Sequence, residues 1–386
     1  MNAVRLGIIG VGSMGASHAR NASQVRDMKL CAVCDNHAEK ADRLAKELGC
    51  LAFHDATALI KSGSVDAVLI ATPHYDHTTI GIAAFEQGLH VLVEKPISVH
   101  KADCERLIAA ADKHPDRTFA AMFMMRTMPT YRKIRDLVKG GELGEIRRVN
   151  WICTNWFRTE AYYASGGWRA TWKGEGGGVL LNQAPHNLDL FQWICGMPSR
   201  VHGFCRLGKW HDIEVEDDVT TFLEYPNGAT GVFITTTGEA PGTNRLEICG
   251  EQGKLVLEGG KLHYSRNVQK MSEFCRTTKE MFAQPEAWEI EIPVTGTGGM
   301  HVEVIQNFVD NILKGTPLIA NAREGIHSVE LANSILYSSL TQQPVDLPLN
   351  GAAFEKALQK MIAESRFVKK TATGATSDMN ASFNLK

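Results

Sequence analysis

Short apolar runs alternate with longer amphipathic stretches along the first third of the chain. The runs have the length of buried strands, and the stretches between them repeat apolar residues at the spacing of one helix face. We expect strands at 4–10, 30–34, 51–53, 65–71, 90–94 and 118–124, with helices between them at 17–25, 38–48, 55–61, 78–87 and 101–113. Elements that alternate in this way predict an α/β fold with a parallel, doubly wound sheet.

The rhythm changes after Arg126. A helix is expected at 130–138, and strand-like runs then follow one another directly, at 146–154, 201–207, 219–225, 229–237, 245–249 and 254–258. The tetrapeptide 225–228, Tyr-Pro-Asn-Gly, is typical of a hairpin turn between two of them. This part therefore predicts an open, largely antiparallel sheet. Two further helices, at 302–313 and 323–340, would close it.

A glycine-rich loop, G-x-G-x-x-G, follows the first strand and precedes a helix at residues 10–15. Its glycines permit a tight turn and a close approach of the backbone to a pyrophosphate at the helix N-terminus. Asp35 ends the next strand, 20 residues after Gly15, where an acid binds the adenosine ribose. The pattern predicts an NAD site, since Asp35 would repel the 2′-phosphate of NADP. The loop residues expected to contact the cofactor are Gly10, Gly12, Ser13 and Met14. The alternative is a structural turn.

Composition narrows the class of protein. The net charge of −2 gives no field for nucleic acid, and no apolar run approaches the ~20 residues that span a membrane. No secretory signal is expected at the start, so the nine cysteines are interpreted as reduced thiols of a cytoplasmic protein. Cys31 and Cys34 lie three apart in a strand, on opposite faces, and are interpreted as structural thiols. No metal site is predicted.

Four motifs together resemble one known family. They are the loop at 10–15, Ala71-Thr72-Pro73 with His77, Glu94-Lys95-Pro96, and Gly176-Gly177-Gly178 leading to His186 and Asp189. Over about residues 4–350 the chain resembles the glucose-fructose oxidoreductase / inositol dehydrogenase / MocA family. The resemblance implies a Rossmann domain at 1–126 and a substrate-binding and oligomerisation domain with an open sheet at 127–368. A disordered tail is expected at 369–386, because it is rich in Thr, Ala, Ser and Asn.

The resemblance also assigns the candidate catalytic residues. The family's catalytic lysine corresponds to Lys95 and its catalytic histidine to His186, and its Lys–Pro peptide is often cis. A buried lysine beside a cationic nicotinamide would have its ammonium form disfavoured, so it could take up a hydroxyl proton. Pro185 indicates that His186 lies in a first helical turn, which favours the neutral ring. Thr72, Pro73, His77, Glu94 and Lys95 are expected at the cofactor, and Arg126 at the substrate.

Asn182 stands where the family often has an aspartate, so this position cannot carry a proton. Its side chain is expected either to contact substrate or to cap the helix that follows. Asp189 would either orient a neighbour or touch substrate.

An aromatic segment, 151–172, holds four of the seven tryptophans. Aromatic faces beside charged donors suit a pyranose, although such residues equally fill cores or subunit interfaces. The preferred substrate contacts are Arg158, Tyr163, Trp168 and Arg169. Residues 155–186 resemble the levoglucosan dehydrogenase / glucoside 3-dehydrogenase branch.

The resemblance thus implies an NAD-dependent dehydrogenase that oxidises a secondary hydroxyl of a pyranose or anhydrosugar, with C3 as one candidate carbon. The alternatives are an inositol or polyol dehydrogenase, a glycosidase that uses bound NAD for transient oxidation, and a non-catalytic NAD-binding regulator. The expected partners are the small-molecule substrate and further copies of the chain, as a homodimer or homotetramer.

Overall fold

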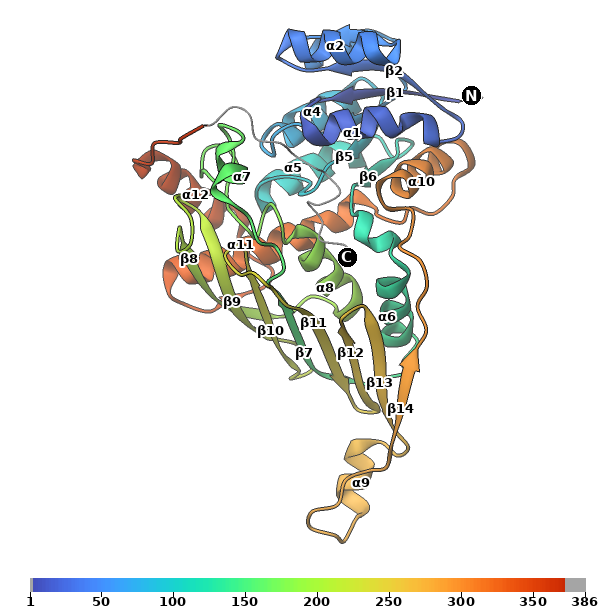
Figure 1. Ribbon diagram of the computed structural model, residues 1–386, viewed down its shortest axis with the longest axis vertical. Helices are drawn as coiled ribbons and strands as arrows, with labels where there is room; N and C mark the ends of the chain where they lie inside the picture. Colours follow the sequence, from blue (N-terminus) through green and yellow to red (C-terminus); the bar gives the residue numbers. More distant parts are fainter. Residues whose placement is uncertain (1–2, 372–386) are drawn as a thin grey trace.

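The computed structural model describes residues 3–371, which form two sheets joined by helices (Figure 1). The first sheet has six parallel strands in the order β3-β2-β1-β4-β5-β6. Its strands are β1 (Val4–Ile9), β2 (Met28–Cys34), β3 (Leu51–Phe53), β4 (Ala67–Ile70), β5 (His90–Val93) and β6 (Phe119–Ala121). Its helices are α1 (Ser13–Asn21), α2 (Ala38–Leu48), α3 (Ala56–Lys61), α4 (Asp76–Glu86) and α5 (Lys101–Asp112). The predicted doubly wound sheet is confirmed.

The carboxyl ends of the central strands meet at one edge of this sheet. Ile9 of β1 pairs with Ile70 of β4, and Ile70 pairs with Val93 of β5. The strand order reverses between β1 and β4, which is where ligands bind in doubly wound sheets. The register therefore brings the glycine loop, Thr72-Pro73 and Glu94-Lys95 to the same place.

The second sheet has nine strands in the order β14-β13-β12-β11-β7-β10-β9-β8-β15. They are β7 (Ile146–Cys153), β8 (Arg200–Leu207), β9 (Glu216–Glu224), β10 (Thr230–Thr236), β11 (Asn244–Gly250), β12 (Gly253–Glu258), β13 (Lys261–Asn267), β14 (Ala287–Ile292) and β15 (Val345–Asp346). The sheet is mixed, because β7 pairs parallel to β10 and antiparallel to β11. After β7 the chain leaves the sheet and returns as β8, next to the edge strand β15. Strand β7 therefore lies between β10 and β11, which come later in the sequence.

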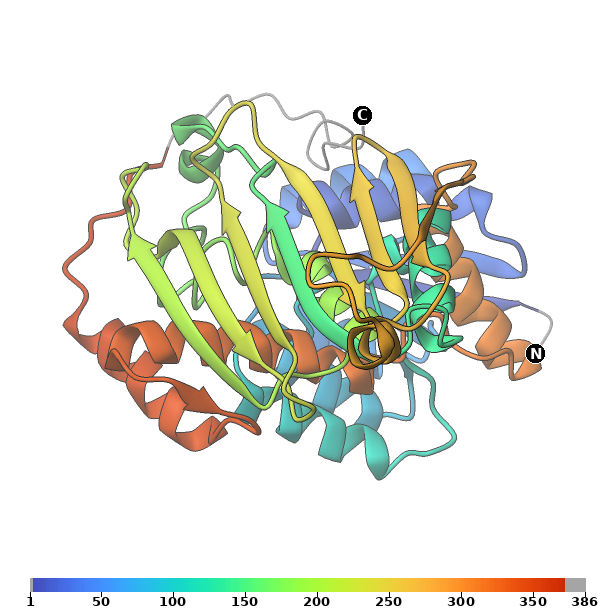
Figure 2. The ribbon, with the colours of Figure 1, turned by 90° about the horizontal axis from the view of Figure 1, so that it is seen from below.

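Helices cover one face of the second sheet, and Figure 2 looks onto the other, open face. The covering helices are α6 (Pro129–Lys139), α8 (Pro185–Cys195) and α11 (Gly325–Thr341). Trp151 of β7 is fully buried under them, stacked on Phe191 at 6.4 Å between ring centroids. This tryptophan of the aromatic segment therefore fills the core.

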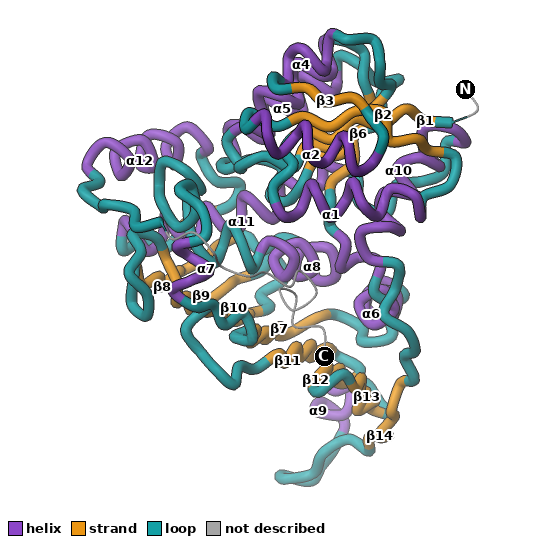
Figure 3. The backbone as a smooth tube through the Cα atoms, turned by 45° about the horizontal axis from the view of Figure 1, so that its top comes forward, coloured by secondary structure: helices purple, strands orange, loops and turns teal. Residues whose placement is uncertain are grey.

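The C-terminal helices return to the first sheet. The helix α10 (Met300–Lys314) lies beside α1 (Figures 1 and 3), and the Ala121 amide donates to the Ala320 carbonyl at 3.1 Å. Strand β13, strand β14, helix α9 (Met271–Thr277) and helix α12 (Gly351–Glu364) were not expected from the sequence. The domain boundary at 126/127 stays a prediction. None of the helices within residues 3–371 has both the length and the apolar character needed to cross a membrane.

Candidate active site

The glycine loop leaves open space where a pyrophosphate would lie. A Cβ added to Gly10, which has φ +87°, would lie 2.7 Å from the backbone of Ala71, and one on Gly15 would lie 1.8 Å from the Gly10 carbonyl oxygen. Both positions are therefore glycine for packing. Gly12 differs, because a Cβ there would meet no atom within 4 Å. The free space in front of Gly12 and the start of α1 fits a dinucleotide.

Asp35 lies against the same loop. Its carboxylate accepts hydrogen bonds from the amides of Val11 and His37, both at 2.9 Å. These bonds fix the carboxylate at the end of β2, where it could also bind the ribose hydroxyls.

His77 and Glu94 are buried, and their side chains are hydrogen-bonded to other residues of the chain. The ring nitrogens of His77 lie 2.8 Å from the Pro96 carbonyl oxygen and 3.0 Å from that of Thr72. His77 is fully buried and ties two strand-end loops together, and its contact with the cofactor stays a prediction. Burial would raise the pKa of Glu94, but the His18 ring at 2.7 Å outweighs it and lowers that pKa to about 2. Glu94 is therefore an anion beneath the cofactor edge.

Lys95 and His186 lie close enough to influence each other's charge. The Lys95 ammonium donates to the main-chain oxygen of Asn182 at 2.7 Å, and the Lys95–Pro96 peptide is cis. Burial lowers the pKa of Lys95 from its ordinary value, and Arg169 lowers it further, although Glu94 opposes the shift. His186 lies in the first turn of α8, as predicted. Its burial, and then the charge of Lys95, lower its pKa well below the ordinary value, so the ring is neutral.

Asn182 does not cap α8. The helix begins at Pro185 after Ala184, which makes no side-chain cap bond. The Asn182 amide nitrogen instead donates to Glu175, and its amide oxygen accepts from the Tyr162 hydroxyl at 3.0 Å. The capping alternative is therefore wrong, and contact with substrate stays a prediction.

Arg126 and Asp189 form a buried pair. The guanidinium donates to both oxygens of Asp189, at 2.8 and 2.6 Å, and each side chain is 1% exposed. A third bond joins Arg126 to Glu324 at 2.5 Å. Asp189 therefore orients Arg126. These carboxylates bind three of the guanidinium N–H groups, and the substrate contact of Arg126 stays a prediction.

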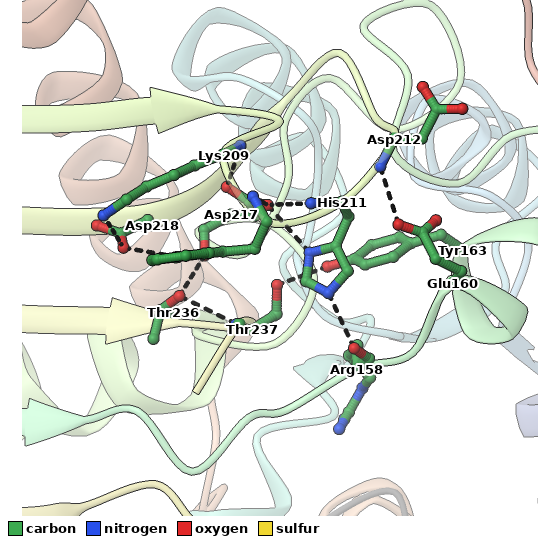
Figure 4. Close-up of polar contacts among 12 residues, drawn as sticks. Arg158, Glu160, Tyr163, Lys209, His211, Asp212, Asp217, Asp218, Thr236 and Thr237 are labelled. Atoms are coloured by element: carbon green, nitrogen blue, oxygen red, sulfur yellow. Dashed lines mark hydrogen bonds and ion pairs between the residues drawn. The ribbon is translucent and has the colours of Figure 1, made fainter. Parts of the chain in front are cut away.

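A hydrogen-bonded network anchors the aromatic segment on the second sheet (Figure 4). The ring nitrogens of His211 lie 3.0 Å from the Asp217 carboxylate and 2.9 Å from the Arg158 carbonyl oxygen. Although burial opposes it, the bond to Asp217 raises the pKa of His211, which suits a ring that faces two acceptors. Tyr163 is buried, with its hydroxyl 2.7 Å from that of Thr237. Its observed role is to anchor the segment.

The remaining predicted residues of this segment lie nearer Asn182. The Arg169 guanidinium lies 4.7 Å from the ring centroids of both Tyr162 and Trp168, and it donates to the Tyr162 hydroxyl at 2.8 Å. The Arg158 guanidinium lies 5.2 Å from the Tyr162 ring. These half-buried side chains stand beside the candidate catalytic residues, whereas Trp151 does not.

Several site residues were missed by sequence reasoning. His18 pairs with Glu94, His74 is buried edge-on to Trp168 at 5.3 Å, and Glu175 is buried against Asn182. The sequence offered one signal for Glu175, because this residue directly precedes the triple glycine motif. The partners of the other two are set by packing between segments far apart in the sequence.

The beginning of the predicted disordered tail contacts this site. The Lys369 ammonium donates to the Tyr163 carbonyl oxygen at 2.7 Å, and Lys370 pairs with Asp212 at 2.6 Å. The rest of that prediction, residues 372–386, lies outside the described residues. Within the described part, no group of three or more His, Cys, Asp or Glu is placed to hold a metal ion.

Two family profiles match successive parts of the chain. Residues 4–122 match the oxidoreductase family with an NAD-binding Rossmann fold, and residues 131–256 match the GFO/IDH/MocA C-terminal domain. The chain belongs to the Gfo/Idh/MocA oxidoreductase family. The predicted family, fold class and NAD-binding domain are confirmed.

Curated relatives in this family include dehydrogenases of polyols and sugars. Inositol 2-dehydrogenase 1 of Saccharopolyspora erythraea is 34% identical over 66% of this chain and 74% of that protein. D-Glucoside 3-dehydrogenase of Escherichia coli is 24% identical over 89% of this chain and 97% of that protein. The 2,7-anhydro-N-acetylneuraminate hydratase of E. coli is 32% identical over 68% of this chain and 72% of that protein.

Solved structures of the family share the whole architecture. The WlbA dehydrogenase of Chromobacterium violaceum, in complex with NADH and UDP-GlcNAcA, is 25% identical with a TM-score of 0.78, over 91% of this chain and 97% of that one. Levoglucosan dehydrogenase, in complex with NADH and levoglucosan, is 20% identical with a TM-score of 0.75, over 90% of this chain and 100% of that one. The second likeness shows a shared fold.

Proposed function

We propose that this Gfo/Idh/MocA oxidoreductase oxidises a secondary hydroxyl of a pyranose or anhydrosugar, and that Lys95 and His186 handle the hydroxyl proton. The observation that carries the proposal is the juxtaposition of Lys95, at the end of β5, with the turn that runs from Asn182 into α8. It places two basic groups of lowered pKa at the edge where a nicotinamide would lie.

The residues present fit NAD. Gly10, Gly12, Ser13 and Met14 would hold the pyrophosphate, and Asp35 the ribose. Thr72, Pro73 and Glu94 stand at the ends of β4 and β5, where they would lie beside the nicotinamide. NAD, when bound, supplies the hydride acceptor.

The chain's own groups supply the proton chemistry. Burial weakens the ammonium of Lys95, so a neutral amine forms more readily there than on a surface lysine. The neutral ring of His186, in the first turn of α8, offers a second acceptor. The half-buried aromatic and cationic group Arg158, Tyr162, Trp168 and Arg169 would face the sugar. Names of relatives such as D-glucoside 3-dehydrogenase support a sugar substrate.

The test is an NADH-production screen with purified protein against pyranoses, anhydrosugars and cyclitols. The proposal expects turnover with a pyranose or anhydrosugar, and turnover lowered by roughly 10²–10⁴-fold in Lys95→Ala. Lys173→Ala is the matched control, because Lys173 is exposed on the loop after Trp172. Faster turnover with a cyclitol would favour the inositol dehydrogenase alternative.

A second candidate is a reaction in which a sugar is oxidised only transiently. It is supported by the relative of 32% identity that is named a hydratase. Such an enzyme would convert an anhydrosugar without net NADH release. Chromatography of the products beside the absorbance assay separates the two reactions.

We also propose a cytoplasmic homodimer or homotetramer. All nine cysteines are free thiols, which suits a reducing compartment. Phe204 and Phe222 are exposed on adjacent strands of the second sheet, and such apolar side chains favour association. Sedimentation of the purified protein tests the oligomer, and a monomer would contradict it.

A further inference from the structure

Glu175 is a buried carboxylate among the candidate catalytic residues. It is 1% exposed, and its oxygens accept from the Ala170 amide and from the Asn182 side-chain amide. Among the ion pairs of the described residues, none within 4.0 Å includes it. A carboxylate is costly to bury without a cation in contact, so its place here needs a reason.

The backbone around Glu175 is fixed. The next residue, Gly176, has φ +80°, and a Cβ there would lie 2.1 Å from Val99. A Cβ on Gly178 would lie 1.9 Å from the Glu216 carbonyl oxygen. The triple glycine therefore packs tightly onto two other segments. The Glu175 amide also donates to the Thr171 carbonyl at 2.9 Å, so the carboxylate is held inside the site.

Asn182 joins this carboxylate to Lys95. Its side-chain amide donates to Glu175, and its main-chain oxygen accepts from the Lys95 ammonium at 2.7 Å. One residue therefore touches the anion through its side chain and the cation through its backbone. Any movement of Asn182 would move the acceptor that holds the Lys95 ammonium.

We propose that Glu175 is a positioning residue for proton transfer: it fixes Asn182, which holds the Lys95 ammonium, and it places a negative charge beside that ammonium. The inference rests on the proposed function for its catalytic meaning. The coupling of Glu175 to Lys95 through Asn182 does not depend on that function.

The charges around this pair set the direction of the effect. The charged groups that act on Lys95 are Glu94, Glu175, Arg158 and Arg169. Three histidines also face it, His74, His186 and His301, and burial is the main cause that lowers the pKa of each. Glu175 faces Lys95, Arg169, Glu216 and Lys369. Burial raises the pKa of Glu175, whereas Arg169 and Lys95 favour its anion. The anion in turn raises the pKa of Lys95, so its removal should let Lys95 lose its proton at lower pH.

The decisive variant is Glu175→Gln, which keeps the shape and an amide oxygen but removes the charge. The control is Glu214→Gln, because Glu214 accepts from the amide of Trp172, on the loop that carries Glu175, and is not among the largest charge effects on Lys95. The Lys95 pKa is read directly by NMR titration of ¹³C-methylated lysines in the full-length protein, with Lys95→Ala to assign the signal.

We expect Lys95 to titrate lower in Glu175→Gln by roughly one pH unit, the size of effect a nearby charge produces. In Glu214→Gln, Lys95 should titrate as in wild type. In Glu175→Asp, which keeps the charge, the Lys95 titration should return most of the way to wild type. The rising limb of the oxidation rate should move to lower pH by the same amount, while the NAD dissociation constant stays unchanged.

An unchanged Lys95 titration in folded Glu175→Gln would overturn the inference. Should that variant fail to fold, Asn182→Ala carries the same titration, with the charge-retaining Glu175→Asp as its reference, and a wild-type Lys95 titration in Asn182→Ala would overturn the inference. A wild-type protein that oxidises none of the sugars would remove the proposed function, while the titration would still decide whether Glu175 is coupled to Lys95.

Discussion

The Lys95 ammonium donates a hydrogen bond of 2.7 Å to the main-chain oxygen of Asn182. Lys95 follows β5 of the first sheet, and Asn182 lies just before α8, which covers the second sheet. This bond therefore joins the cofactor edge of the Rossmann sheet to the helix that carries His186. The proposed chemistry depends on that junction.

Cofactor choice should depend on Asp35. We expect higher kcat/KM with NAD than with NADP, because the carboxylate beside the glycine loop would repel a 2′-phosphate. Asp35→Ala should reduce that preference by about tenfold or more, the equivalent of ~1.4 kcal/mol. Asp42→Ala, on the adjacent α2 where Asp42 pairs with His54, is the control. Equal efficiency with both cofactors in the wild type would contradict the expectation.

The aromatic segment should govern sugar affinity. Trp168→Ala and Arg169→Ala should each raise the sugar KM by about tenfold, since each removes a stacked or charge-assisted contact of ~1–2 kcal/mol. NAD affinity should hardly change. Trp288→Ala is the control, because Trp288 is exposed on β14. Loss of folding or of the oligomer in the first two variants would instead assign these side chains to packing.

The buried pair of Arg126 and Asp189 should matter for stability. Arg126→Met leaves a carboxylate buried without its cation, which should lower the free energy of unfolding by about 3–5 kcal/mol. The pair of Arg20 and Glu47, whose side chains are 55% and 43% exposed, gives the comparison, and Arg20→Met should cost at most about 1 kcal/mol. Urea unfolding of both variants measures the difference. Similar losses in the two would refute the structural role.

Acid stability should report the pair of His18 and Glu94. The pKa of Glu94 is about 2 in the folded protein and near 4.5 in an unfolded chain. The folded state therefore gains stability from this group above about pH 4.5 and loses it as pH falls toward 2. Glu94→Gln should flatten the fall in unfolding free energy across that window. In Glu47→Gln, which removes the exposed partner of Arg20, most of the wild-type slope should persist, because solvent weakens an exposed pair.

The Rossmann half could be predicted because its signals are local. Strands β4, β5 and β6 are short apolar runs buried on both faces, and the glycine loop connects one strand with one helix. Strands β13 and β14 were missed because they mix polar and apolar residues and are not buried on both faces. The parallel pairing of β7 with β10 depends on where the chain returns after α8, which no local pattern encodes.

The candidate site, too, could be predicted only where its signals are local in the sequence. Lys95 and His186 were found from motifs, and the structure brings them together. The bonds of Arg126 to Asp189 and Glu324 span 63 and 198 residues of sequence, so a lone arginine after a strand was interpreted as a substrate contact. Glu175 acts on Lys95 through Asn182, and such a relation appears only when three segments are packed.

Proton transfer by Lys95 is the central claim, and single-turnover NADH formation in Lys95→Ala tests it most directly. NAD and a sugar identified in the screen are mixed with excess enzyme, and the rate is followed across pH with wild type and Lys173→Ala beside it. NAD should still bind, because the glycine loop and Asp35 are untouched. We predict a rate lowered by roughly 10²–10⁴-fold, the usual contribution of general acid–base catalysis, and a flattened or displaced rising limb of the pH profile. A near-wild-type rate with an unchanged pH profile would remove Lys95 from the mechanism and leave His186 as the base.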